Sequence, residues 1–440
     1  MILAVDFGST YTKATAIDGR GVAGTAKAFT TIGTDIREGL GKALAELEKQ
    51  TGPAEYGVRL AASSAGGGLK MVAAGLVPGL TAKAALLAAE SAGAKVVKTY
   101  AYELSAAEAG EIRAAAPDLV LLSGGTDGGN KEVVLANAKT LAETDGDFAV
   151  IVAGNKTAAE GALRALESGG KRAVAVPNVM PRLGELDIMP ARLAIRQLFM
   201  EKIVEAKGLG QAAKMMSLPI IPTPLAALLA AELLAEKIGS LAAVDIGGAT
   251  TDVYSVCGGE PTKGGVLPKG LPEPFAKRSV EGDLGMRYSL ASLVEAPPQS
   301  AGCGDFLSKC ARDPSYVPAA GSADAELDAA LCAKALAIAI RRHSGYLERV
   351  YTPLGETHYQ FGKDLGDVKH LVGIGGALVY AGDPAGILDR ALEAARESMR
   401  LVPQKPGYLF DRKYIFGAMG LVSQVDRELA AKIMLREVLP

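Results

Sequence analysis

Short apolar runs alternate with amphipathic helical stretches along most of the chain. Residues 35–50 place Ile36, Leu40 and Leu47 on one face of a helix, whereas residues 118–122 form an apolar run with the length of a buried strand. Strands that alternate with helices indicate a sheet with parallel strands that is covered on both faces, so the pattern predicts an α/β fold. Further helices are expected at residues 81–91, 131–143, 157–168, 190–207, 225–234 and 323–349. Residues 297–322 read as a loop.

Two strands end in an aspartate that is followed by a glycine turn. Apolar residues lead into Asp245, after which Gly247 and Gly248 allow a tight turn and expose backbone N–H groups. A carboxylate beside such donors repels phosphate unless a divalent cation lies between them, so the pattern predicts a site for phosphate and metal. The same pattern opens the chain and aligns Asp6 with Asp245, Gly8 with Gly247, Thr12 with Thr251 and Lys13 with Asp252. Two matching turns are far more specific than one.

A third glycine-rich turn follows a short apolar strand late in the chain. Residues 370–378 comprise the strand, a turn that contains Gly373, Gly375 and Gly376, and the start of a helix. A helix N-terminus reached through glycines accepts phosphate or packs against a purine. Coming after the two hairpins, this turn completes the set expected of a nucleotide site.

The length of 440 residues exceeds what one hydrophobic core supports, so two or more domains are expected. We expect a first domain over residues 1–237 with an inserted α/β region at about 147–207. A second domain is expected over residues 238–415, followed by a C-terminal helix over 416–440 that returns to the first domain. Loops that follow the strands lie at their carboxyl ends, where ligands bind in open α/β sheets.

Composition and charge narrow the class of partner. Hydrophobic residues make up 49% of the chain, charged residues 22%, and the net charge is −2. This balance gives no electrostatic reason to bind nucleic acid or an anionic membrane. The longest uncharged stretch, residues 215–231, contains three prolines and is too short to span a membrane. The four cysteines and the direct start in a core strand predict a cytoplasmic protein with reduced thiols.

These motifs, in this order, resemble the ATPase domain shared by actin, sugar kinases and the heat-shock chaperone ATPases. The resemblance covers nearly the whole chain and implies a two-domain actin-like (ribonuclease H-like) α/β fold with a nucleotide cleft between the domains. Residues 6–13, 121–130, 245–252 and 280–287 together resemble the glutamate mutase accessory family, called MutL or GlmL. That closer resemblance implies an adenosylcobalamin-dependent mutase as the partner and ATP-dependent reactivation, like that of a chaperone, as the activity.

The motifs and the resemblance together assign the candidate site residues. Asp6 and Asp245 are expected to hold Mg²⁺ and to act in catalysis, with a plain capping carboxylate as the alternative. Lys13 is expected to reach a phosphate, with a solvated strand residue as the alternative. The nucleotide, ATP or ADP, is expected to contact Gly8, Ser9, Thr10, Lys13, Gly247, Gly248, Ala249, Thr250, Gly282, Asp283, Gly373, Gly375 and Gly376. Of these, Gly282 and Asp283 lie in a segment similar to the helix start that follows the second phosphate turn in heat-shock ATPases.

One departure from the heat-shock ATPases concerns hydrolysis. Those proteins carry a glutamate at the start of the first connecting helix, where this chain has Thr223 and Pro224. Because no carboxylate is available there, we expect a slow Mg²⁺-dependent ATPase, while nucleotide binding is retained.

Two other functional classes use the same fold and stay open at this point. A small-molecule kinase needs a carboxylate base, for which Asp127 is the candidate. An activator of radical dehydratases needs cysteines that bind a cluster, and Cys303 with Cys310 is the candidate pair, with ordinary buried or surface thiols as the alternative. Asn155 and Asn178 stand at strand ends, where they either reach a ligand or only hold their loops. The number of subunits is also open, with a homo-oligomer as one option.

Overall fold

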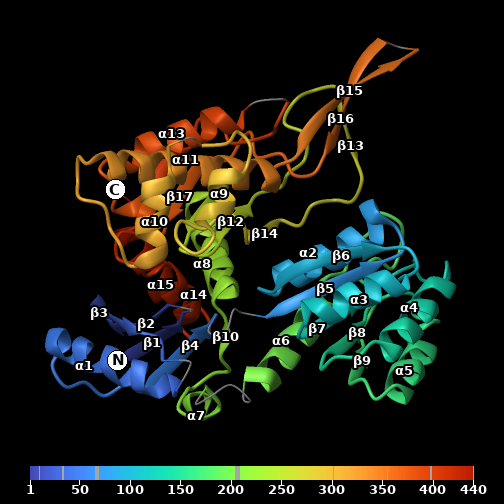
Figure 1. Cartoon of the computed structure of the whole chain (residues 1–440), viewed down its shortest axis with the longest axis horizontal. Coiled ribbons are helices and arrows are strands. Elements are labelled where there is room, and N and C mark those ends of the chain that lie inside the picture. The colour runs from blue at the N-terminus through green and yellow to red at the C-terminus, as the bar shows by residue number, and fades with distance from the viewer. Residues whose placement is uncertain are drawn as a thin grey trace. The chain divides into compact units, whose positions relative to one another are not determined.

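The computed structural model describes residues 1–8, 10–31, 34–64, 69–203, 209–300, 302–353, 355–396 and 399–439. The chain forms two compact units (Figure 1). The first consists of Met1–Ala227 with Gly270–Pro272, and the second of Leu228–Lys269 with Glu273–Pro440. Among the described helices, none combines the length and the apolar character that a bilayer span requires.

The first unit opens with a mixed five-stranded sheet. Its central strand β1 runs antiparallel to β2 and parallel to β4. At the two edges, β3 is antiparallel to β2 and β10 is parallel to β4. The order is β10-β4-β1-β2-β3, formed by β1 (Ile2–Phe7), β2 (Tyr11–Asp18), β3 (Gly21–Phe29), β4 (Val58–Ser63) and β10 (Ile221–Pro222). The helices of this part are α1 (Ile36–Thr51) and α7 (Leu209–Ala213), while α8 (Thr223–Ile238) begins in the first unit and continues in the second. Asp35 caps α1 and Leu40 lies on its buried face, which confirms the helix predicted at residues 35–50.

The second unit repeats this sheet with the same strand order and directions. Its central strand β11 is antiparallel to β12 and parallel to β17, and β14 and β18 lie at the edges. The order is β14-β12-β11-β17-β18, formed by β11 (Leu241–Ile246), β12 (Thr251–Val256), β14 (Ala276–Glu281), β17 (His370–Ile374) and β18 (Gly407–Phe410). Two copies of this five-stranded unit in one chain constitute the actin-like (ribonuclease H-like) α/β fold, so the predicted fold class is confirmed.

A separate, fully parallel sheet lies within the first unit. Its order is β6-β5-β7-β8-β9, formed by β5 (Lys70–Gly75), β6 (Lys95–Ala101), β7 (Leu119–Leu122), β8 (Ala149–Val152) and β9 (Ala173–Ala175). The helical elements around it are η2 (Pro78–Ala82), α2 (Lys83–Ser91), α3 (Ala106–Ala115), α4 (Glu132–Glu143), α5 (Ala159–Ser168) and α6 (Met189–Ile203). The sheet that holds β8 and β9 thus begins at Lys70, earlier than the insertion expected at about 147–207.

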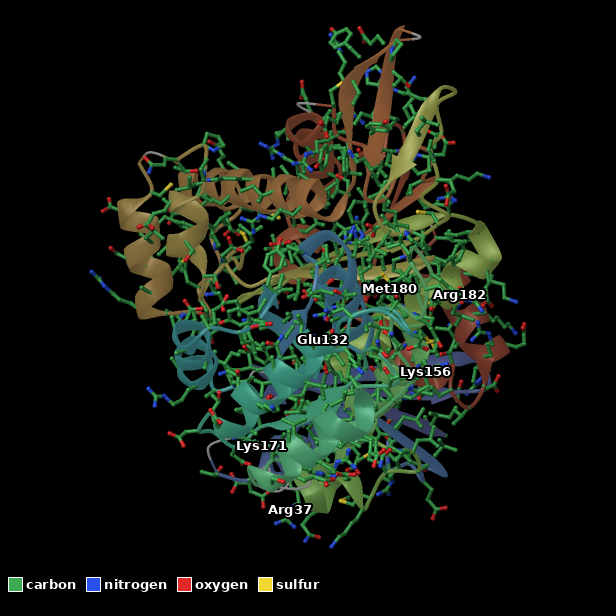
Figure 2. All side chains as sticks on the ribbon, turned by 90° about the vertical axis from the view of Figure 1, so that its right-hand side faces the viewer. Arg37, Glu132, Lys156, Lys171, Met180 and Arg182 are labelled. Atoms are coloured by element: carbon green, nitrogen blue, oxygen red, sulfur yellow. The ribbon has the colours of Figure 1, made fainter. Side chains whose placement is uncertain are left out.

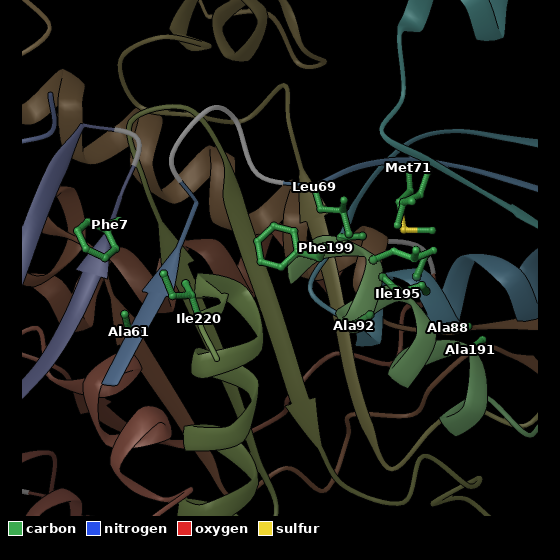
Figure 3. Close-up of a cluster of buried hydrophobic side chains, with 14 of the residues drawn as sticks. Phe7, Ala61, Leu69, Met71, Ala88, Ala92, Ala191, Ile195, Phe199 and Ile220 are labelled. Carbon is green, nitrogen blue, oxygen red and sulfur yellow. The ribbon is translucent and has the colours of Figure 1, made fainter. Parts of the chain in front are cut away.

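One hydrophobic cluster joins the two sheets of the first unit (Figure 3). Phe7 and Ala61 come from the first sheet, Met71 from the parallel sheet and Ile195 from α6, and all four are almost completely buried. Burial of this apolar surface fixes the parallel sheet against the first sheet, because each large side chain such as Phe7, Met71 or Ile195 stabilises the folded state by about 1.5–3 kcal/mol when buried.

The second unit also carries a small three-stranded sheet and most of the remaining helices. The small sheet has the order β13-β16-β15, formed by β13 (Val266–Lys269), β15 (Tyr346–Thr352) and β16 (Gly355–Phe361). The helices are α9 (Leu290–Glu295), α10 (Gly304–Arg312), α11 (Ala323–His343), α12 (Gly376–Val379), α13 (Pro384–Ala395), α14 (Phe416–Val422) and α15 (Arg427–Glu437).

Two secondary-structure predictions in this unit were wrong. Residues 297–322 were expected to be a loop but contain α10, a short helix that buries Phe306 and Cys310 one turn apart. One such pair is too short a pattern to show helical periodicity. Helix α11 was expected to continue to residue 349 but ends at His343, where Ser344 takes an extended backbone conformation (φ −76°, ψ 157°). Gly345 then donates to the carbonyl of Lys363 (2.7 Å) and approaches Phe361 so closely that a Cβ would lie 2.4 Å from its carbonyl oxygen. The chain therefore turns into β15 at this glycine.

A buried histidine ties α11 to two strands of the second sheet. The Nε2 atom of His343 lies 2.8 Å from the hydroxyl of Ser255 on β12, and its Nδ1 atom lies 2.7 Å from the hydroxyl of Ser279 on β14. Burial lowers the pKa of His343 well below its ordinary value, and the ammonium groups of Lys277 and Lys363 act in the same direction. The neutral ring can therefore donate to one serine and accept from the other.

This arrangement predicts that the protein loses stability as the pH falls. The unfolded chain binds a proton at His343 below about pH 6.5, whereas the folded chain does not, so the stabilisation is present above that pH and is lost below it. Replacing His343→Gln should lower the free energy of unfolding near neutral pH. The free energy of unfolding of this variant should also fall less steeply on acidification, by up to about 1.4 kcal/mol per pH unit. Denaturant unfolding followed by circular dichroism at a series of pH values measures both effects, and equal slopes in the two proteins would contradict the assignment.

Candidate functional site

The turn after β11 presents backbone donors beside a carboxylate. Asp245 is partly exposed near the end of β11, and the N–H of Gly247 donates across the turn to the carbonyl of Thr250 (2.9 Å). Within the described part of the chain, the N–H groups of Gly248, Ala249 and Thr250 have no acceptor, and all three residues are partly exposed. Successive free N–H groups of this kind form a concave site for an anion.

The carbonyl oxygens of the same turn are all used inside the protein. Gly285 comes so close that a Cβ there would lie 2.3 Å from the carbonyl carbon of Ala249, so only glycine permits this approach. The residues that follow Gly285 supply the donors: Met286 to Gly247 (3.0 Å), Arg287 and Tyr288 to Gly248 (2.8 Å each), and the Ser289 hydroxyl to Ala249 (2.7 Å). Because the carbonyls are held inward, the N–H groups are directed away from this segment.

The turn after β1 is built in the same way. The N–H of Gly8 donates to the carbonyl of Tyr11 (3.1 Å), as Gly247 does to Thr250. The carbonyls of Gly8 and Thr10 accept from the hydroxyl (2.8 Å) and the N–H (2.9 Å) of Thr30, respectively. Ser9, a predicted phosphate contact, lies outside the described residues.

Strand register confirms the alignment of the two turns. Asp6 is paired with Lys13 across β1 and β2, and Asp245 is paired with Asp252 across β11 and β12. In each hairpin the following pair places a threonine on the second strand, Thr12 or Thr251. The two predicted carboxylates therefore occupy equivalent positions in the two units.

The first aspartate is held by two side chains. The hydroxyl of Thr223, the first residue of α8, donates to the carboxylate of Asp6 at 2.6 Å. The ammonium nitrogen of Lys13 lies 3.9 Å from the other oxygen of the same carboxylate, and both side chains are only partly exposed. In the sequence Thr223 is notable only because heat-shock ATPases have a carboxylate there, whereas in the structure its hydroxyl has Asp6 as a partner.

The residue equivalent to Lys13 in the second unit is neutralised within the protein. Asp252 forms a buried ion pair with Arg278, with a nitrogen–oxygen distance of 2.6 Å, and it also accepts a bond from the Thr250 hydroxyl (3.2 Å). Arg278 lies on the edge strand β14. No sequence motif singled out this arginine, because its role follows only from the pairing of β14 with β12.

The segment before Gly285 is organised by an arginine from α11. Arg342 donates to Glu281 and, with two of its nitrogens, to both oxygens of Asp283 (2.9 and 3.1 Å). Burial raises the pKa of Glu281 against the effect of Arg342. Burial also acts to raise the pKa of Asp283, but the hydrogen bonds and charge of Arg342 lower it on balance. The predicted contact Asp283 is thus paired with Arg342, and the carbonyl of the predicted contact Gly282 accepts from Ser289 (2.9 Å).

The third turn lies directly beside the second. Gly375 has a φ of 99°, and a Cβ on it would lie 2.2 Å from the carbonyl oxygen of Ile246, so the position requires glycine. Gly376 is partly exposed and begins α12. Gly373, by contrast, lies inside β17, where a Cβ would meet the side chain of Leu378 at 2.8 Å. The structure therefore gives Gly373 a packing role and brings Gly375 and Gly376 next to the turn at Gly247.

The donor set fits magnesium with nucleotide better than a metal held by protein alone. Among the described residues, no group of three or more histidine, cysteine, aspartate or glutamate side chains could hold a metal ion. Mg²⁺ in nucleotide sites is usually bound through one or two carboxylates, with phosphate oxygens and waters completing the shell. Asp6 and Asp245, each partly exposed beside a glycine turn, are carboxylates of the type that such a site uses.

The glycine-rich loop with the candidate kinase base is held by its own neighbours. The carboxylate of Asp127 accepts from the N–H of Lys156 (3.0 Å) and from the side chain of Asn178 (3.1 Å). Asn155 is buried and donates to the carbonyls of Gly129 and Asn130 (2.9 and 3.2 Å). These contacts give both asparagines the loop-holding role, and Asp127 joins the same network. The segments that follow β7, β8 and β9 in the chain can be located in Figure 2 by the labelled residues Glu132, Lys156 and Arg182.

The cysteines considered for a cluster are core residues. Cys303 and Cys310 are each 2% exposed and belong to one hydrophobic cluster with Phe306. Burial raises the pKa of the Cys310 thiol. Both therefore agree with the alternative of ordinary buried thiols.

The close approach at Gly285 makes a direct prediction. Gly285→Ala should displace the turn at Gly248 and Ala249, because backbone atoms there cannot yield as a flexible side chain would. Titration with Mg²⁺ and ATP should then show affinity lower by about tenfold or more, the equivalent of 1.4 kcal/mol. The matched control is Gly258→Ala in the same unit, since nothing lies within 4 Å of a Cβ at that position. Equal affinity in the two variants would contradict the account of the turn.

Comparison with solved structures gives only weak likenesses. A ROK hexokinase from Thermus thermophilus is 14% identical, with 99% of each chain covered and a TM-score of 0.31. The (R)-2-hydroxyglutaryl-CoA dehydratase component A of Acidaminococcus fermentans is 11% identical, with 98% of this chain and 96% of that chain covered and a TM-score of 0.31. An ATP-dependent caprolactamase from Pseudomonas jessenii is 13% identical, with 98% and 70% covered and a TM-score of 0.40. TM-scores this low do not establish a shared fold, so the fold assignment rests on strand topology.

Comparison of sequences is decisive for the family. The family described as MutL protein matches residues 2–438. Protein MutL of Clostridium tetanomorphum is 45% identical over 451 residues, which covers 98% of both chains. This chain therefore belongs to the MutL family, the family of glutamate mutase accessory proteins.

Proposed function

We propose that this protein is an ATP-binding, chaperone-like accessory protein for an adenosylcobalamin-dependent mutase of the glutamate mutase type. In this proposal it reactivates the mutase by nucleotide-driven exchange of a damaged cofactor. Membership of the MutL family supports the mutase as partner. The proposal also places the protein in the cytoplasm, a compartment in which thiols such as those of its four buried cysteines stay reduced.

The observation that carries the nucleotide part of the proposal is the turn at Gly248–Thr250. Its three N–H groups have no acceptor within the described residues, and its carbonyls are already used. A triphosphate supplies the missing acceptors, and Mg²⁺ neutralises the repulsion between that triphosphate and Asp245. The equivalent turn after β1, with Asp6 and Lys13, gives the first unit a candidate site of the same kind for phosphate and metal.

The proposed cycle depends on a difference between ATP and ADP. ATP brings a γ-phosphate to the turns and ADP does not, so the two nucleotides favour different states of the protein. A mutase that binds one state better is then held or released according to the nucleotide. Thr223, which donates to Asp6 where heat-shock ATPases have a glutamate, supports slow hydrolysis and hence a long-lived ATP state.

The test is a reactivation assay with an inactivated glutamate mutase. Mutase activity should return only when this protein, Mg²⁺ with ATP, and fresh adenosylcobalamin are all present. The double replacement Asp6→Ala and Asp245→Ala should abolish recovery, because both carboxylates next to the turns are removed. Asp367→Asn is the control, since Asp367 is an exposed carboxylate outside the site.

Two results would refute the reactivation proposal. One is equal recovery of mutase activity without ATP. The other is failure of the protein to associate with the mutase in the presence of ATP, of ADP or of neither nucleotide. Either result would leave the membership of the family unaffected. The nucleotide site would then be tested separately, by binding experiments.

A further inference from the structure

The parallel sheet of the first unit has the strand order of a flavodoxin-like, doubly wound fold. When β5 to β9 are counted as strands 1 to 5, the spatial order β6-β5-β7-β8-β9 reads 2-1-3-4-5, and all neighbouring strands are parallel. In sheets of this order, ligands bind outside the carboxyl ends of strands 1 and 3, where the strand order reverses. The corresponding place in this chain lies between β5 and β7.

The chain leaves β5 and β7 toward opposite faces of this sheet. Ala88 of α2, the helix after β5, packs in the same hydrophobic cluster as Met71. Ala138 of α4, the helix after β7, packs in the cluster that contains Val72. Met71 and Val72 are neighbours on β5, so their side chains point to opposite faces. The connections that follow β5 and β7 therefore diverge, as they do at the ligand sites of this fold class.

The turn after β7 carries a group of backbone donors without acceptors. Within the described parts of the chain, the N–H groups of Gly124, Gly125 and Thr126 have no acceptor, and neither has the N–H of Gly154 in the loop after β8. Gly154 contacts Gly124, since a Cβ on Gly154 would lie 2.9 Å from both the nitrogen and the oxygen of Gly124. The three glycines are buried, and buried N–H groups are nearly always paired in native proteins. Four such donors in one place favour the binding of an acceptor.

A serine at the base of the turn adds a side-chain donor. The hydroxyl of Ser123 is fully buried and has no hydrogen-bond partner among the described residues. The N–H of Ser123 donates to Ala74 (2.8 Å), so this residue continues the register of β7 beside β5. Because side chains alternate along a strand, Ser123 lies on the same face as Leu121, which is the face that α2 covers after β5. Its hydroxyl is therefore placed between β5 and β7, at the point where the strand order reverses.

The carbonyl oxygens of the turn are already used. The carbonyl of Gly124 accepts from the N–H of Asn155 (3.0 Å), and the carbonyl of Gly125 accepts from the side chain of Asn178 (3.0 Å). The carbonyl of Thr126 accepts from an N–H within the same loop (2.9 Å). The turn thus offers donors and no free acceptors, which is the property of a backbone site for an anion.

One carboxylate follows these donors directly. Asp127 accepts from the N–H of Lys156 (3.0 Å) and from the side chain of Asn178 (3.1 Å), so its charge is partly offset by donors of the protein. Lys156 itself is exposed and brings a positive charge to the loop after β8 (Figure 2). The acidic residue therefore does not exclude an anion from the turn.

We propose that the turn Ser123–Thr126, together with Gly154, is a second phosphate-binding site, separate from the turns proposed for ATP. The hydroxyl of Ser123 and the N–H groups donate to the oxygens of a phosphate group, which belongs to free phosphate or to a small phosphate ester. Binding at this site does not require Mg²⁺, because neutral donors contact the phosphate directly. The inference is independent of the proposed function, since the turns for ATP follow β1 and β11 whereas this turn follows β7.

Hydrogen exchange on the whole chain tests the site, with inorganic phosphate as the probe. Without Mg²⁺, peptides that cover residues 123–126 and 154 should exchange more slowly when phosphate is added. Glycerol 3-phosphate distinguishes the two sources of the ligand. Protection by both compounds identifies a site that accepts phosphate esters, and protection by phosphate alone identifies free phosphate as the ligand. Unchanged exchange of these peptides with both compounds would overturn the proposal.

Ser123→Ala separates a role in binding from a role in the fold. Because the hydroxyl has no partner among the described residues, the melting temperature without phosphate should stay the same or rise. Calorimetry should show phosphate binding that is weaker by about tenfold or more, because a hydrogen bond to a charged group is lost. Ser168→Ala is the matched control, since Ser168 is exposed at the end of α5 and donates only to the carbonyl of Arg164 (2.7 Å). It should bind phosphate as the wild-type protein does.

The outcomes separate this inference from the proposed function. If Ser123→Ala binds phosphate as tightly as the wild-type protein and melts at a lower temperature, the hydroxyl serves the fold and the site is refuted. If phosphate protects residues 123–126 but ATP with Mg²⁺ does not bind, the second site stands and the nucleotide part of the proposed function falls.

Discussion

The contact between Gly285 and the turn at Gly248–Ala249 is the constraint on which the candidate site depends. The four residues after Gly285 take carbonyl oxygens of the turn, and within the described residues the N–H groups of Gly248, Ala249 and Thr250 beside Asp245 have no acceptor. A turn with free carbonyls would repel a triphosphate, whereas this one offers only donors. The remaining arrangement follows from this direction: Arg342 holds the segment before Gly285, and Arg278 neutralises Asp252 on the returning strand.

Duplication supplies two similar turns with different side-chain chemistry. In the first unit, Lys13 faces Asp6 and the hydroxyl of Thr223 completes the surroundings of that carboxylate. In the second unit, the position of Lys13 is taken by Asp252, whose charge is already balanced. The first turn therefore adds a positive charge near its aspartate, and the second adds backbone donors. In each unit a carboxylate thus lies beside a glycine turn, an arrangement that suits phosphate together with a divalent cation.

The fold and the two main turns could be predicted from sequence because their signals are local. Apolar strands that end in Asp6 and Asp245, each with a glycine two residues later, set the turn and the strand register together. The residues that sequence analysis missed act through contacts that are distant in the chain. Arg342 reaches Asp283 from α11, and Arg278 reaches Asp252 through the pairing of β14 with β12. Such pairings leave no periodic pattern or motif in the sequence.

Hydrogen exchange at the turn tests the central claim most directly. If the N–H groups of Gly248, Ala249 and Thr250 bind phosphate, peptides that cover residues 247–250 should exchange slowly with ATP and Mg²⁺ and rapidly without them. Tripolyphosphate with Mg²⁺ should protect the same peptides, because the backbone contacts are made to phosphate alone. The account is contradicted if ATP binds with measurable affinity and exchange at residues 247–250 does not change.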